Sequence, residues 1–102
     1  MKPIGLAGLP LTPHGLYPPP IPEPAPKGHS ATVFVNGRPV HRVGDKFIPH
    51  RVVGIVIGTE HSDTLIVGEP RVYADGKMIA FQGSSTDHGS QVVTGSHTVF
   101  MG

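Results

Sequence analysis

Residues 33–45 read Val-Phe-Val-Asn-Gly-Arg-Pro-Val-His-Arg-Val-Gly-Asp, and this stretch carries the pattern of a short β-hairpin. β-branched and aromatic residues fill positions 33–35. The next two residues, Asn36-Gly37, are the dipeptide that most favours a two-residue turn between antiparallel strands. The chain returns through 38–43 and is stopped by Gly44-Asp45. The stretch therefore predicts two short strands joined by a tight turn.

The hairpin pattern recurs along the chain. Residues 72–83, Val-Tyr-Ala-Asp-Gly-Lys-Met-Ile-Ala-Phe-Gln-Gly, align on 33–44 without a gap, and a third copy begins at Val99-Phe100. No segment keeps the 3.6-residue period of a helix. We therefore expect an all-β fold of three pseudo-equivalent hairpin repeats with no helix of consequence. The side chains expected in its core are those of Val33, Val35, Val72 and Val99.

Composition limits the classes of protein to which this chain can belong. It has 102 residues, a net charge of +1, 12 Pro and no Cys. The low charge argues against nucleic-acid binding, and the longest apolar run, 52–57, is too short to cross a bilayer. The N-terminus lacks the pattern of a secretory signal, so we expect synthesis in the cytoplasm. We expect one domain over 1–102, with a Pro-rich extended segment at 1–27 and the hairpins at 28–102.

Histidine is unusually frequent, with seven residues in the chain. We call the segment that precedes each hairpin its lead-in. The lead-ins of the second and third copies match, because His61 lies eleven residues before Val72 and His88 lies eleven residues before Val99. The first copy opens with His14, and His50 takes a similar place after the first hairpin. Neutral imidazole is a common metal ligand, and structural zinc takes four ligands. The repeat therefore predicts one metal site, formed by His14, His50, His61 and His88, with zinc as the expected ion and iron less favoured.

We expect the remaining histidines and two nearby carboxylates to have other roles. The histidines that we do not expect to bind metal are His29, His41 and His97. His41 falls in the middle of a predicted strand, and His97 takes the place that Pro70 holds in the second copy. Asp63 and Asp87 are candidates either for metal ligation or for accepting the ring N–H of a ligand.

Two other functions are compatible with these patterns. A small hydrolase built on the histidines would need an exchangeable water on the metal and a substrate cleft. A metal-free β-module that binds through a sheet edge would carry its histidines on the surface. The chain contains neither a Gly-x-Ser-x-Gly element nor a phosphate-binding Gly-rich loop before a helix, so we do not expect an enzyme.

Residues 33–45 also resemble the motif of PAAR-repeat proteins. In that family Pro-Ala-Ala-Arg precedes x-Gly-Asp, and here Pro39-Val40-His41-Arg42 precedes Val43-Gly44-Asp45. Residues 78–81 are a weaker copy, in which Ser84 replaces the aspartate. The likeness extends over 12–102 and is closest to the short forms of contractile phage tails, which open with His-Gly and end on Val-Phe-x-Gly.

The resemblance implies a small conical β-fold that caps the blunt end of a trimeric β-helical spike, one tip per trimer. Such tips sharpen the spike for puncturing a target membrane, in phage tails and in type VI secretion. It also implies an apical zinc held by three His and one Cys. His14, His50 and His61 match family histidines, and His88 stands where the short forms often carry Cys. The expected location is a virion tail tip or the tip of a bacterial injection apparatus, with no nucleic-acid partner.

Overall fold

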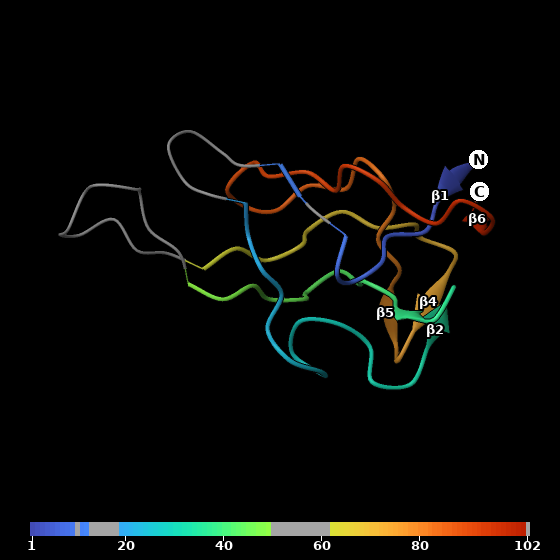
Figure 1. Ribbon diagram of the computed structural model, residues 1–102, viewed down its shortest axis with the longest axis horizontal. Helices are drawn as coiled ribbons and strands as arrows, with labels where there is room; N and C mark the ends of the chain where they lie inside the picture. Colours follow the sequence, from blue (N-terminus) through green and yellow to red (C-terminus); the bar gives the residue numbers. More distant parts are fainter. Residues whose placement is uncertain (10, 13–18, 50–61, 102) are drawn as a thin grey trace, which may run out of the picture.

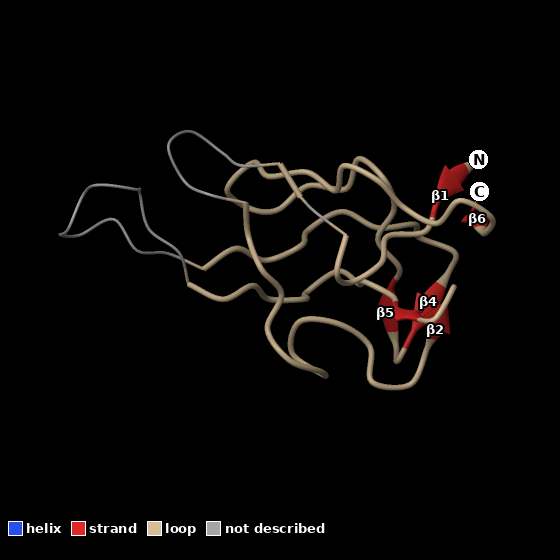
Figure 2. Ribbon diagram, viewed as in Figure 1, coloured by secondary structure: helices blue, strands red, loops and turns tan. Residues whose placement is uncertain are grey.

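The protein is described by a computed structural model that covers residues 1–9, 11–12, 19–49 and 62–101. These residues contain no helix, and so none long and apolar enough to cross a membrane. Their strands are β1 (Lys2–Pro3), β2 (Phe34–Val35), β3 (Arg38–Pro39), β4 (Tyr73–Ala74), β5 (Lys77–Met78) and β6 (Phe100–Met101). The strands gather at the end of the molecule that holds both chain termini (Figures 1 and 2). The predicted all-β fold is confirmed.

Two of the three units are the hairpins expected from the turn dipeptides. β2 pairs antiparallel with β3, and β4 pairs antiparallel with β5. The turn residues Asn36 and Gly37 have φ angles of 54° and 76°, and Asp75 and Gly76 have 55° and 77°. Two successive residues with positive φ are what the tightest hairpin turn requires, which explains the preference for Asn-Gly and Asp-Gly.

The third unit is built from both ends of the chain. β6 pairs antiparallel with β1, in the register of the other two hairpins. The residue pairs at the equivalent position are Phe34 with Pro39, Tyr73 with Met78, and Phe100 with Pro3. Residues 3–8 thus align with 39–44 and 78–83, and all three segments end on a glycine with φ between 90° and 97°. The sequence predicts the start of this copy at Val99-Phe100 but not its return strand.

The three units close into a ring. Each unit pairs with the next through Arg42 and Ile79, Phe81 and Ile4, and Leu6 and Val40. At the centre the backbone N–H of Gly5 donates to the carbonyl of Ala80, Ala80 donates to His41, and His41 donates back to Gly5, over 2.8–2.9 Å. The molecule measures 40 × 23 × 23 Å, and two equal short dimensions fit a threefold arrangement about the long axis.

The core lies inside this ring, in two layers. Near the hairpins the buried side chains are Ile4, Leu6, Val40, Ala74, Ile79 and Met101, and below them are Leu11, Phe47, Leu65, Ala80 and Val92. The predicted valine core is only partly right. Val33, Val35 and Val72 are half-buried against the first layer, whereas Val99 is exposed. The inner positions go instead to the residue that follows each return strand, because that residue faces the axis.

A buried ion network joins the first and second units. The Arg42 guanidinium donates to Asp45 Oδ1 at 2.7 Å, to Asp75 Oδ2 at 2.9 Å and to the carbonyl of Pro26 at 2.6 Å. Arg42 and Asp45 are almost wholly buried. Although burial opposes the charged form, the hydrogen bonds and charges of the two carboxylates outweigh it and raise the pKa of Arg42. The arginine therefore stays charged inside the fold.

Asp75 should make stability depend on acid. Hydroxyl hydrogen bonds from Ser30 and Thr32, followed by the charge of Arg42, hold the pKa of Asp75 below its usual 3.8. A carboxyl group whose pKa is lower in the folded than in the unfolded chain stabilises the fold at pH values above its unfolded pKa. This stabilisation is lost as the pH falls through the folded pKa. Melting temperatures measured from about pH 6 to about pH 2 should therefore fall less steeply in Asp75→Asn than in the natural chain.

Asparagine is chosen as the replacement for Asp75 because the first unit already has an asparagine at the equivalent position. Asn36 occupies the equivalent turn position and makes the equivalent hydrogen bonds with Ser96 and Thr98. The substitution thus keeps hydroxyl partners and removes the titrating charge. Parallel melting curves for the two proteins across the acid range would contradict this account.

Candidate metal centre

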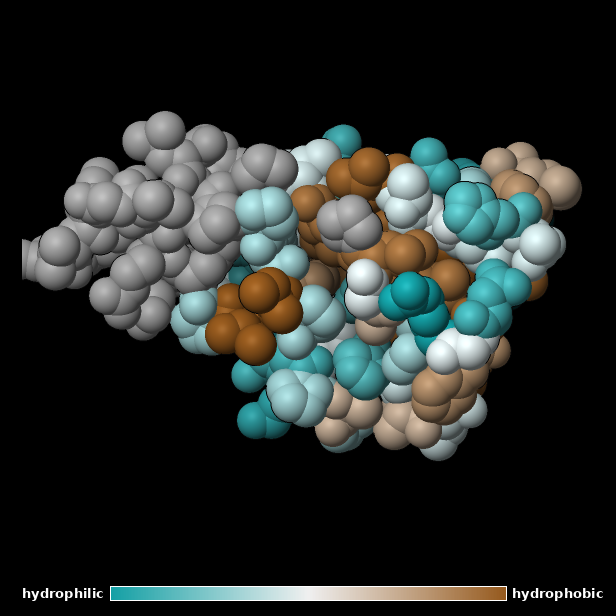
Figure 3. Space-filling model, in the orientation of Figure 1, coloured by the Kyte–Doolittle hydropathy of each residue, from teal (hydrophilic) through white to brown (hydrophobic). Residues whose placement is uncertain are grey.

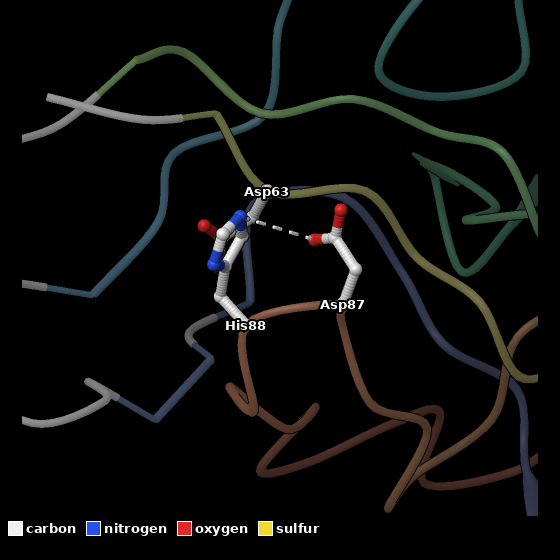
Figure 4. Close-up of side chains that lie close together, drawn as sticks. All are labelled: Asp63, Asp87 and His88. Atoms are coloured by element: carbon white, nitrogen blue, oxygen red, sulfur yellow. Dashed lines mark ion pairs between the residues drawn. The ribbon is translucent and has the colours of Figure 1, made fainter.

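Three side chains that could bind a metal ion lie close together, one from before the second hairpin and two from after it. Atoms of Asp63, Asp87 and His88 that could bind metal all lie within 4.8 Å of one another. Asp63 is completely buried, whereas Asp87 and His88 are exposed. Figure 4 shows the His88 ring drawn over Asp63, with Asp87 to one side, and His88 Nε2 lies 3.9 Å from Asp87 Oδ1. One imidazole and two carboxylates are donors that zinc and related divalent metals accept.

Thr86 fixes the loop that carries His88. Its hydroxyl donates to Asp63 Oδ2 at 3.1 Å and accepts from the backbone N–H groups of His88 and Ser90. The turn closes at Gly89, which has φ of 95° and donates to the carbonyl of Thr86. A small polar residue followed by Asp-His-Gly therefore presents the imidazole at a defined place beside Asp63.

The neighbouring strand segment holds the second carboxylate. The N–H of Thr64 donates to Asp87 Oδ1 at 3.0 Å, and the N–H of Asp87 donates to the carbonyl of Thr64 at 3.0 Å. This reciprocal pair ties the loop of the third lead-in to the lead-in of the second. The sequence singled out Asp63 and Asp87 as ligands or ring acceptors, and the structure brings both to His88.

His14, His50 and His61 lie outside the described residues. The described residues that neighbour these three histidines in the sequence lie near the segment that carries His88. The N–H of Phe47 donates to the carbonyl of Asp63 at 2.9 Å, and the N–H of Thr12 donates to the carbonyl of Gln91 at 2.8 Å. In Figure 1 the lime and yellow ends of the described chain lie close together, away from the strands.

The other three histidines have different surroundings. His41 is completely buried in the central ring and packs on Phe47, with 5.5 Å between ring centroids. Within the described residues neither of its ring nitrogens forms a hydrogen bond. His29 Nδ1 lies 3.0 Å from the carbonyl of Ser30, and His97 is exposed. Of these three histidines, only His41 therefore contributes to the core.

Comparison with known proteins places this geometry in a family. No curated protein sequence matches the chain. Residues 25–94 match the family described as the PAAR motif, and this range contains both turn-dipeptide hairpins and the cluster at His88. The match covers more than half of the chain, and the resemblance seen in residues 33–45 is confirmed. This chain, with its hairpins closed into a ring of three, belongs to the PAAR motif family.

Proposed function

We propose that this chain is the metal-tied tip of a contractile injection machine and caps one trimeric β-helical spike. Membership of the PAAR motif family points to a spike-tip protein of such a machine. The proposal that one chain caps one trimeric spike rests on the closed ring of three equivalent units within a single chain. A monomer with that arrangement can offer the same surface to each chain of a trimer, which a chain without internal repeats cannot do.

The end of the molecule that carries the hairpins is the one suited to contact the spike. Each hairpin is a separate two-stranded sheet, and the outer edges of such a sheet carry backbone N–H and C=O groups that can pair with a further strand. Addition of strands from a β-rich partner satisfies such edges. The tip would then sit with its hairpins on the spike and its opposite end toward the target membrane, at the end of a virion tail or a bacterial injection apparatus.

The metal proposed for the opposite end is zinc. His14, His50, His61 and His88 would hold it, and Asp63 or Asp87 would either accept the ring N–H of a ligand or replace one histidine. The donor set at His88 fits a divalent transition metal, and backbone bonds bring the described neighbours of the other histidines to the same region. When bound, the metal would cross-link segments that lie far apart in the sequence.

Metal removal should strongly destabilise the protein. Structural zinc contributes binding free energy on the order of 10–16 kcal/mol. We expect about one zinc per untagged chain by elemental mass spectrometry, and a large fall in melting temperature after chelation. His88→Ala should lower metal content and melting temperature together, whereas His97→Ala, at an exposed histidine outside the proposed set, should change neither. A metal-free preparation whose melting is unaffected by a chelator would exclude the site.

The tip role itself is tested by assembly. Each trimeric β-helical spike protein encoded in the same genome is purified and mixed with the chain, and the mixture is analysed by native mass spectrometry. We expect a complex of one chain with three spike subunits. Failure to bind any of these trimers, by a chain that is folded and loaded with metal, would refute the proposed function.

A further inference from the structure

An aromatic side chain stands at the same exposed position in each of the three units. These residues are Phe34, Tyr73 and Phe100, which begin β2, β4 and β6 and lie opposite the equivalent residue of the return strand. They are 55%, 59% and 43% exposed. Large apolar side chains exposed together at repeat-related positions are typical of an interaction surface.

The neighbouring residues show that folding does not require these aromatics. In each hairpin strand the next residue turns inward: Ala74 and Met101 are buried in the first core layer, and Val35 packs against it. Successive side chains of a strand point to opposite faces, so the aromatics face outward. They belong to neither core cluster. Met1 and Val99 are also exposed, and Figure 3 shows moderately hydrophobic residues among hydrophilic ones at the end that carries the strands.

Each unit also repeats a cation. Arg38, Lys77 and Lys2 hold equivalent positions on β3, β5 and β1, and all three are exposed. Lys2 contacts Glu69 at 3.4 Å and lies over the Phe81 ring. Among the described residues Arg38 and Lys77 form no ion pair. The hairpin end thus presents one aromatic and one basic side chain per unit.

We infer that Phe34, Tyr73 and Phe100 form a threefold anchor for the end of a homotrimer. Each partner chain would supply an apolar surface for one of the three aromatics. This inference rests on the proposed function and names the contact that it requires. A second copy of this chain is a poor occupant, because facing hairpin ends would oppose three cations to three cations.

The test measures affinity for the trimeric spike that forms the one-to-three complex. Phe34→Ser, Tyr73→Ser and Phe100→Ser should each weaken binding by about tenfold or more, and the triple variant should show no measurable binding. Ile66→Ser is the matched control, because Ile66 is 52% exposed and lies outside the hairpins. It should change affinity by less than about threefold, and all variants should melt within a few degrees of the natural chain.

The outcomes separate this inference from the proposed function. If the natural chain binds no trimer, the proposed function fails. If it binds and the triple variant binds equally well, or if only one of the three positions matters, the threefold anchor is wrong while the tip role stands. If sedimentation shows that the aromatics instead drive dimers of this chain, the assignment of the occupant is overturned.

Discussion

Arg42→Phe is expected to destabilise the protein by about 3–5 kcal/mol, because it leaves the buried carboxylate of Asp45 without its cation. The side chains of Arg42 and Asp45 are 2% and 0% exposed, so water cannot replace the lost partner. Denaturant unfolding followed by circular dichroism measures the change. The loss should exceed that of any substitution at the exposed hairpin positions.

The second unit supplies the compensating change. There Phe81 and Ser84 hold the places of Arg42 and Asp45, and the Ser84 hydroxyl accepts from the Phe81 N–H at 2.9 Å. Asp45 accepts from the Arg42 N–H in the same way, at 2.6 Å. The double variant Arg42→Phe/Asp45→Ser therefore transplants an arrangement that the fold already contains. It should recover most of the lost stability. Equal destabilisation of the single and double variants would mean that Arg42 acts through packing rather than charge.

Removal of residues 1–9 should abolish cooperative folding. The deletion takes away β1, the buried side chains of Ile4 and Leu6, and one third of the central ring. Each lost core side chain alone is worth about 2–5 kcal/mol, and a domain of this size holds only about 5–15 kcal/mol in total. Thermal melting followed by circular dichroism should show no sigmoidal transition. A truncated chain that still melts cooperatively would show that the ring does not need its third member.

Peptide complementation provides the control. A synthetic peptide of residues 1–9, added in excess, should restore a cooperative transition, because it can supply the missing return strand. A peptide of the same composition in scrambled order should not. Lys2→Ala in the intact chain should have a much smaller effect than the deletion, since it removes only the ion pair of the exposed Lys2 with Glu69 and its contact over the Phe81 ring.

The hairpins could be predicted because their signals are local. Asn36-Gly37 and Asp75-Gly76 each encode their turn within two residues, and both turns have the expected positive φ angles. The third unit has no such signal, because its strands come from residues 2–3 and 100–101. A signal for it does exist in Pro-Ile-Gly-Leu-Ala-Gly at 3–8, which matches Pro-Val-His-Arg-Val-Gly at 39–44 in its proline, its β-branched residue and its final glycine.

The candidate metal site likewise has one part that the sequence predicts and another that only the fold shows. Repeat alignment found His88, and its proximity in sequence to Asp87 suggested the carboxylate that lies beside it. The contribution of Asp63 depends on the bonds that join two lead-ins, which only the fold supplies. The predicted roles of His14, His50 and His61 concern residues outside the described ranges and stay predictions.

The pairing of β1 with β6 also constrains how the protein can be made. Residues 2–3 leave the ribosome well before their partners at 100–101 have been translated. During elongation Ile4 and Leu6 therefore have no completed ring in which to be buried. The ring can close only after residues 100–101 have emerged, and folding must close the long loop between residues 3 and 100. A nascent chain would thus keep Ile4 and Leu6 exposed to solvent until residues 100–101 have been made.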